Sequence, residues 1–245
     1  MNIVNVKNLT KNFHDLTAVD HISFQVKKGD IYGFVGPNGA GKSTTINMLS
    51  GLLIPDNGTI LFEGGATFDK WHASIGLVPQ DLAIYPDLSA EENVSFFASL
   101  YGLKGKDLKQ HVMDALKLVG LEEHKKKRSE KYSGGMKRRL NIACGIVHKP
   151  KLIIMDEPTV GIDPQSRNFI LDSIRKLSQN GTTVIYTSHY MEEVAEICNK
   201  ILLIDHGKVI ITGEIEEIRN KFSKEEELSL EEIFLLLTGK ELRDS

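Results

Sequence analysis

The chain has 245 residues, of which 26% are charged, and its formal net charge is −3. This length suits one large α/β domain that buries most of its apolar surface, and it requires no second domain. The nearly balanced charge gives no electrostatic reason to expect a nucleic-acid partner. The two cysteines, Cys144 and Cys198, lie in apolar periodic segments, so we expect reduced, buried thiols rather than a disulfide framework.

Two strands are predicted at the N-terminal end, over residues 2–9 and 20–27. In the second, apolar residues such as Ile22 and Phe24 alternate with polar ones, which indicates a strand with one buried face. Phe13 lies between the two strands. Two interpretations of this aromatic residue remain open, a core residue near a turn and a ring on which a base stacks.

Residues 36–44 fit the phosphate-binding pattern G-x-x-x-x-G-K-[ST] at every fixed position. The glycines let backbone N–H groups turn inward to phosphate oxygens, and Asn38 is a residue type that tolerates left-handed backbone angles. Lys42 is expected on the β- and γ-phosphates, and Ser43 is expected to offer its hydroxyl to Mg²⁺. The segment is therefore predicted to bind phosphate through Gly36, Asn38, Gly39, Gly41, Lys42, Ser43 and Thr44.

The segments on either side of this loop agree with that prediction. A short buried strand is predicted over residues 30–35, and a helix follows over residues 44–50, closed by Gly51. This helix, starting near Lys42, would direct its positive end at the bound anion. The sequence therefore predicts a nucleotide site at the junction of strand and helix.

Further strands are predicted over residues 59–63 and 74–78, the second ending at Pro79 and Gln80. Residues from about 85 to 150 then read as a helical insertion. It begins with the capping-box spacing of Ser89 and Glu92, and a second helix is predicted over residues 107–119.

A basic run at residues 124–128 lies inside this insertion. Such a run is ordinarily a solvated surface, with attraction of phosphate as the alternative. No site residue is assigned to it.

Strand pattern returns at residues 152–155, directly before Asp156 and Glu157. Acids at the carboxyl end of a strand lie where α/β sheets bind ligands, although adjacent carboxylates can also be a plain solvated strand end. Because a phosphate loop is present, we favour the first interpretation. One acid would hold Mg²⁺ and the other would orient the attacking water.

Asp163 and Pro164 are predicted to cap and begin a helix that runs through residue 179. A buried strand over residues 182–187 should then bring His189 to the same sheet edge as the two acids. The other seven histidines show no metal-ligand spacing, so His189 is singled out by this position.

Residues 132–140, Tyr-Ser-Gly-Gly-Met-Lys-Arg-Arg-Leu, open a helix just before the acidic strand and resemble the signature motif of ATP-binding cassette (ABC) ATPases. The commonest signature has leucine and glutamine where this chain has Tyr132 and Met136. Residues 1 to about 213 then follow that family's order: the aromatic loop at Phe13, the phosphate loop at 36–44, the glutamine loop at Gln80, the signature at 133–137, the acidic strand at 152–157, the D-loop at 160–163 and the switch histidine His189.

The C-terminal segment at residues 228–239 looks like the ending of bacterial multidrug-type export ATPase subunits. The alternative interpretation is a short amphipathic helix. The resemblance implies an ABC ATPase domain over residues 1–213 and a C-terminal helical tail over residues 214–245. The implied fold is α/β, with a P-loop NTPase (RecA-like) parallel-sheet core, an N-terminal antiparallel β subdomain and a helical signature subdomain.

The resemblance also implies the mechanism. Two subunits, expected as a homodimer, pair head to tail, and each sandwiches ATP between its own phosphate loop and the partner's signature. Ser133 and the N–H groups of Gly134 and Gly135 open a helix, so they would bind the γ-phosphate held by the facing protomer. The implied catalytic residues are Glu157, His189 and Gln80, the implied Mg²⁺ ligands are Ser43, Gln80 and Asp156, and Phe13 joins the ATP-binding residues.

As a family member the chain would be a cytoplasmic subunit, bound peripherally to the inner face of the cell membrane through a separate transmembrane permease. Its longest apolar runs are far too short to span a bilayer, and residues 81–85 would dock the permease. Export is favoured, because importer subunits often carry a further C-terminal domain.

Two other classes compete with this interpretation. A soluble cassette ATPase of translation resembles two tandem cassettes and one of DNA repair carries a long coiled-coil insertion, and neither fits this sequence. A regulatory module without turnover is opposed by the presence of both Glu157 and His189.

Overall fold

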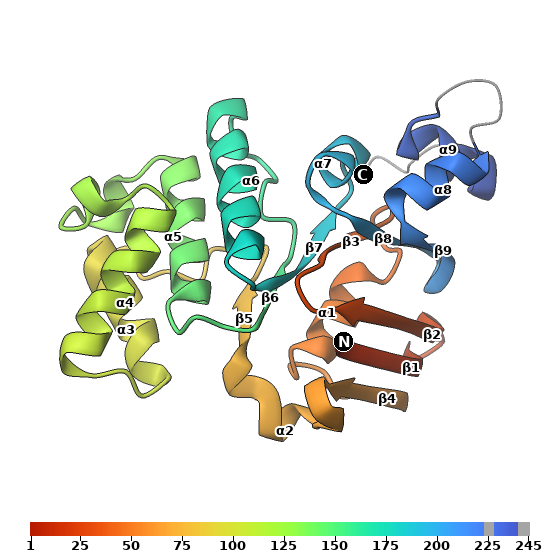
Figure 1. Ribbon diagram of the computed structural model, residues 1–245, viewed down its shortest axis with the longest axis horizontal. Helices are drawn as coiled ribbons and strands as arrows, with labels where there is room; N and C mark the ends of the chain where they lie inside the picture. The colour runs from red at the N-terminus through yellow and green to blue at the C-terminus, as the bar shows by residue number, and fades with distance from the viewer. Residues whose placement is uncertain (223–227, 240–245) are drawn as a thin grey trace. The chain divides into compact units, whose positions relative to one another are not determined.

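The structure, a computed structural model, describes residues 1–222 and 228–239 (Figure 1). The chain folds into two compact units. Unit 1 combines Met1–His72 with the described part of Thr183–Ser245, and unit 2 is Ala73–Thr182. Unit 1 is therefore built from the two ends of the chain.

An antiparallel sheet opens unit 1, with strand β1 (Asn2–Phe13) between β2 (Leu16–Lys27) and β4 (Asn57–Phe62). Both predicted N-terminal strands exist. Each is longer than expected, because the two strands stay paired up to a tight turn of two residues. In the added part, Lys11 pairs with Val19 and Asn12 with Thr17. Apolar and polar residues do not alternate in this mostly polar part, so the sequence pattern does not predict a strand there.

Parallel strands form the core of unit 1. Strand β3 (Ile31–Val35) lies between β7 (Thr183–Ser188) and β8 (Lys200–Asp205), and β9 (Lys208–Glu214) is antiparallel to β8. Every residue of β3, β7 and β8 is buried, as expected for strands covered on both faces. The predicted strands before the phosphate loop and before His189 are confirmed.

The helices of unit 1 follow from these strands. Helix α1 (Lys42–Leu49) follows β3 and α7 (Met191–Ile197) follows β7, while α2 (Phe68–Trp71) follows β4. The tail contributes α8 (Ile215–Phe222) and α9 (Leu230–Thr238), which lies beside α7 and α8 (Figure 1). Helix α9 begins with a capping box and buries Leu230, Ile233 and Phe234. The amphipathic helix expected there is present, whereas residues 223–227 and 240–245 of the predicted tail lie outside the described residues.

Unit 2 holds two parallel strands, β5 (Ile75–Val78) and β6 (Leu152–Met155), and four α-helices, with short 3-10 helices at Glu122–His124 and Ser129–Lys131. Helices α3 (Ala90–Leu100), α4 (Gly105–Leu118) and α5 (Gly134–Ile146) lie side by side (Figure 1), and α6 (Pro164–Gln179) packs against α5. The capping box at Ser89 and the cap of α6 by Asp163 are both formed as predicted. The α/β class, the helical insertion and the antiparallel N-terminal sheet are thus all present.

The expectation for the two cysteines is also met. Both cysteines are free and buried, and burial raises the pKa of each thiol above its ordinary value. Within residues 1–222 and 228–239, no helix has the length and apolar character to cross a bilayer.

Candidate functional site

The phosphate loop, residues 36–44, connects the buried strand β3 to helix α1 in unit 1. Gly39 and Gly41 have φ angles of 78° and 105°, in the region that favours glycine. A Cβ on Gly36 would lie 2.1 Å from the carbonyl oxygen of Ile204, and one on Gly41 would lie 2.5 Å from that of Ala18. Glycine is therefore required at positions 36 and 41 for close backbone approach. Asn38 is exposed and does not adopt the left-handed angles that its residue type would tolerate.

Lys42 opens helix α1 and is only 5% exposed. Its Nζ donates hydrogen bonds to the carbonyl oxygens of Gly36 at 2.7 Å and Pro37 at 3.2 Å, so the loop's own backbone holds the ammonium. Gly41 is the N-cap of this helix and offers no side-chain hydrogen bond, and helix N-termini of this kind attract anions. Ser43, the next residue, is exposed.

Phe13 and His189 also belong to unit 1. Phe13, at the end of β1, is 44% exposed, so the interpretation of this ring as a core residue is wrong. The Nζ of Lys11 lies 5.7 Å from the centroid of the Phe13 ring. His189 follows β7 directly and is half-buried, with its ring centroid 4.1 Å from that of Tyr190.

In unit 2, the two acids follow strand β6 and are both buried, Asp156 at 8% and Glu157 at 7% exposure. A plain solvated strand end is therefore excluded. Glu157 has a φ of 45°, a left-handed conformation that costs a residue other than glycine about 1–3 kcal/mol. The Nε2 of Gln80 donates to Oε2 of Glu157 at 3.5 Å. The structure thus brings together two of the three residues predicted to be catalytic.

Helix α5 holds the glutamine loop in place through two residues that the sequence analysis did not single out. Asn141 accepts a hydrogen bond from the backbone N–H of Ala83 at 3.1 Å and donates to the carbonyl of Pro79 at 3.3 Å. Arg138 donates to the same Pro79 carbonyl at 3.2 Å. Both side chains are buried. Asn141 stands between Leu140 and Ile142, so a polar residue in an apolar run could have revealed it, whereas Arg138 lies in a basic run that offers no such signal.

The signature forms the start of α5. Ser133 caps the helix, and its Oγ accepts a hydrogen bond from the N–H of Met136 at 3.3 Å. A Cβ added to Gly134 would meet nothing within 4 Å, whereas one added to Gly135 would lie 2.0 Å from Oγ of Ser166 on α6. The signature motif predicts one role for both glycines, but the structure separates them. Gly134 leaves an open approach to the helix, and Gly135 permits close packing between α5 and α6.

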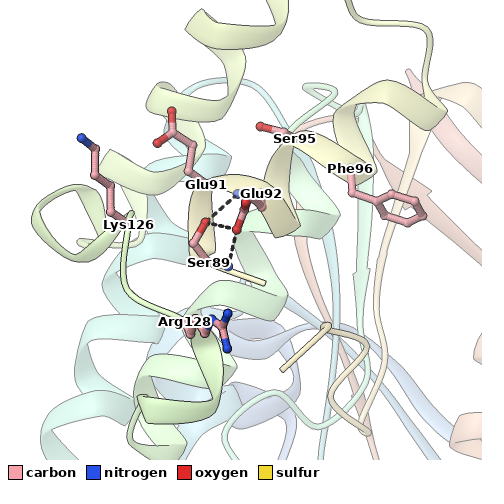
Figure 2. A pocket seen from close by; sticks show the side chains of 7 residues that line it. All are labelled: Ser89, Glu91, Glu92, Ser95, Phe96, Lys126 and Arg128. Carbon is pink, nitrogen blue, oxygen red and sulfur yellow. Dashed lines mark hydrogen bonds between the residues drawn. The ribbon is translucent and has the colours of Figure 1, made fainter. Parts of the chain in front are cut away.

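The basic run is largely exposed, as expected of a solvated surface. Lys126 and Arg128 line a surface pocket of about 600 Å³ at the start of α3 (Figure 2). Glu91 and Glu92 line the same pocket and offset its positive charge. Hydrogen bonds from Ser89 hold the pKa of Glu92 below its ordinary value, and the charge of Arg128 contributes. This balance opposes the alternative of a phosphate-attracting patch.

The ABC transporter family profile matches residues 19–160 of this chain. The linearmycin resistance ATP-binding protein LnrL of Bacillus subtilis is 50% identical over 214 residues, which cover 86% of this chain and 69% of that protein. The chain belongs to the ABC transporter family. Other ABC relatives are the probable multidrug ABC transporter ATP-binding protein YbhF of Escherichia coli and the Nod factor export ATP-binding protein I of Ralstonia nicotianae. YbhF is 35% identical over 96% of this chain and the Nod factor protein is 36% identical over 88%.

The chain spans 41% of the length of YbhF and 68% of that of the Nod factor protein. Solved ABC cassettes have the same fold. The ATP-binding subunit of an ABC transporter matches with a TM-score of 0.86 and 27% identity, covering 96% of this chain and 99% of the other. A dimeric cassette bound to ADP and Pi in a post-hydrolysis state matches with a TM-score of 0.77 and 25% identity, covering 87% and 99%. The predicted family and the P-loop cassette fold are confirmed, and this ABC chain is an ATP-binding and ATP-hydrolysing cassette.

Proposed function

We propose that this chain is the ATPase subunit of an ABC exporter and that it drives a separate membrane permease through ATP-dependent dimerisation. The observation that supports turnover most directly is Glu157, a buried carboxylate in a strained backbone conformation beside Gln80. Residues in such conformations cluster at active sites, and Glu157 combines the conformation with burial and a contact to Gln80.

ATP binding is proposed to rest on unit 1. The glycine backbone of the phosphate loop and the ammonium of Lys42 would receive the phosphates, and the exposed ring of Phe13 would stack on the base. The proposed nucleotide contacts within one protomer are Phe13, Gly36, Asn38, Gly39, Gly41, Lys42, Ser43 and Thr44.

Mg²⁺ is proposed to be held by oxygen atoms of Ser43, Gln80 and Asp156. Hydroxyl, amide and carboxylate oxygens are the donors that this hard cation prefers, so the donor set fits. Residues 1–222 and 228–239 contain no cluster of three or more His, Cys, Asp or Glu that could hold a metal by itself, and Mg²⁺ commonly takes few protein ligands and several phosphate oxygens. When bound, it would neutralise charge on the phosphates.

Hydrolysis is proposed to use Glu157 and His189. Glu157 would orient the attacking water as general base, and His189 would contact the γ-phosphate. Ser133 and the open N-terminus of α5 at Gly134 would bind the γ-phosphate of ATP held by a second copy of the chain. Gly135 would support this contact through its packing on α6. Hydrolysis would then remove the anion that joins the two copies, and the dimer would open.

The permease is proposed to dock on unit 2. Leu82 and Tyr85 in the segment after Gln80 are 41% and 48% exposed, and Phe96 and Leu100 on α3 are 39% and 64% exposed. Apolar side chains gathered in one region of a surface commonly mark an interaction site. Docked in this way, the chain would sit in the cytoplasm on the inner face of the membrane. Residues 1–213 would form the cassette and residues 214–245 the tail.

Affinity purification of the full chain from detergent-solubilised membranes tests this proposal. We expect a multi-spanning membrane protein to co-purify, and ATP hydrolysis by the complex should drive movement of its substrate across reconstituted vesicles. A chain carrying Leu82→Asp serves as the matched control and should recover less permease. Recovery of ribosomes or DNA in place of a membrane protein would contradict the proposal.

A further inference from the structure

Glu193 is a buried carboxylate in unit 1 that the proposed chemistry leaves without a role. It lies in the first turn of helix α7, four residues after His189, and is only 2% exposed. The Oη of Tyr186 donates a hydrogen bond to its Oε2 at 2.6 Å, and the Oγ of Ser188 donates to the same oxygen at 3.4 Å. Both donors belong to strand β7.

A carboxylate withdrawn from water destabilises the fold unless hydrogen bonds compensate for its lost hydration. A hydrophobic side chain at this position could join α7 to β7 without that cost. Both hydrogen bonds of Glu193 described above instead join it to the carboxyl end of β7. Ser188 is the last residue of that strand, and its Oγ also accepts a hydrogen bond from the backbone N–H of Tyr190 at 2.9 Å.

These bonds enclose His189. The side chain of Ser188, on one side of the histidine, links the carboxylate of Glu193 to the backbone N–H of Tyr190 on the other side. The ring of Tyr190 also lies against the imidazole. A turn held by contacts of this kind presents its side chain without rearrangement when the substrate arrives.

We infer that Glu193 is a positioning residue for ATP hydrolysis, which fixes the turn that presents His189 to the γ-phosphate. The inference rests on the proposed function of His189. It assigns Glu193 no contact with ATP, because its carboxylate is buried against Tyr186 and Ser188.

Substitution of a positioning residue should lower kcat, whereas substitution of a purely structural residue should lower the stability of the fold. Small displacements of a catalytic group by a distant change can slow the chemical step up to about a hundredfold. Glu193→Ala should therefore lower kcat for ATP by about tenfold to a hundredfold in the full chain, while KM stays within about twofold because the phosphate loop is untouched. Glu193→Gln keeps an oxygen that accepts from Tyr186 and Ser188, and should restore most of the parent kcat. Glu192→Ala, at an exposed position of the same helix, is the matched control and should behave as the parent.

A double-mutant cycle with His189→Ala isolates the positioning role. In the His189→Ala background, Glu193→Ala should cause no further loss of kcat, since there is no imidazole left to position. A parent-like kcat for Glu193→Ala, or a loss that adds fully to that of His189→Ala, would overturn the inference while leaving the role of His189 intact. A parent-like kcat for His189→Ala itself would refute the proposed role of that histidine, on which the inference rests.

Discussion

Two buried charged residues carry most of the expected chemistry, and each is held in a different way. Lys42 is held by carbonyl oxygens of its own loop, so its ammonium has partners before a phosphate arrives. Glu157 is held by the backbone conformation and by its neighbour Gln80. Substitution of Lys42 should therefore weaken ATP binding, and substitution of Glu157 should slow ATP hydrolysis.

Glu157→Gln should retain ATP binding and lose hydrolysis by at least about a hundredfold, because the amide cannot act as a general base. The ATP-bound dimer should then accumulate. Size-exclusion chromatography of the full chain with ATP and Mg²⁺ measures this, with ADP as the control. A variant that hydrolyses ATP at the parent rate, or stays monomeric at high concentration with ATP, would count against the proposed role.

Lys42→Met keeps the aliphatic stem and removes the charge, so it isolates the contact to phosphate. A charge-assisted hydrogen bond contributes about 1.5–3 kcal/mol, which corresponds to an ATP affinity weaker by about tenfold to 150-fold. Isothermal titration calorimetry measures the affinity, and thermal denaturation without nucleotide checks that the fold persists. Unchanged affinity in a folded variant would contradict the role of Lys42.

At the scale of elements, helix α5 combines three tasks. Its first turn presents the signature, Gly135 lets it pack closely on α6, and Arg138 and Asn141 hold the glutamine loop. The adjacent glycines of the signature should therefore respond differently to substitution.

Gly134→Asp places a carboxylate in open space at the start of α5. It should repel the γ-phosphate of a facing protomer and abolish ATP-driven dimerisation, while the affinity of the protomer for ATP and its melting temperature remain near those of the parent. Analytical ultracentrifugation with and without ATP, using a hydrolysis-deficient background, measures the dimer. Dimerisation at the parent level would mean that this end of α5 does not face the nucleotide.

Gly135→Ala should instead lower stability by about 1–3 kcal/mol, because its Cβ would overlap Ser166. Denaturant unfolding measures this loss. Adding Ser166→Gly removes the overlapping atoms and should recover part of it. A fully stable Gly135→Ala chain would show that α5 and α6 can separate without cost.

At this scale, elements made of buried apolar runs could be predicted from the sequence, whereas features that depend on polar pairing or distant contacts could not. The strands before the phosphate loop, the acids and His189 are short runs of buried apolar residues, and such runs stand out in a sequence. The far ends of β1 and β2 are paired through polar residues and gave no pattern. The different roles of Gly134 and Gly135 depend on Ser166, which lies on another helix far along the chain, and no local pattern records it. Glu193 lies in the acidic first turn of α7, a position that ordinarily predicts a solvated side chain, and its burial depends on how the helix packs on β7.

For the whole molecule, the predicted partner is a membrane protein, and the segment after Gln80 offers the means to separate docking from chemistry. Leu82→Asp adds a charge to an exposed apolar side chain, so it should weaken assembly with the permease while the isolated chain binds ATP with parent affinity. Quantitative co-purification from membranes and nucleotide titration together measure both effects. Loss of ATP binding in a folded Leu82→Asp chain would show that the segment belongs to the nucleotide site instead. The half-buried Ile84 is a poorer choice, since its substitution also disturbs packing.

The left-handed backbone at Glu157 has a consequence for anyone who redesigns this sequence. At such an angle glycine is the least strained residue, so Glu157→Gly should melt at or above the parent temperature, whereas Glu157→Ala, which keeps a Cβ, should not. Differential scanning calorimetry of the two variants would reveal the difference. An optimisation guided by thermostability alone would therefore favour glycine at position 157 and would discard the carboxylate proposed as the general base.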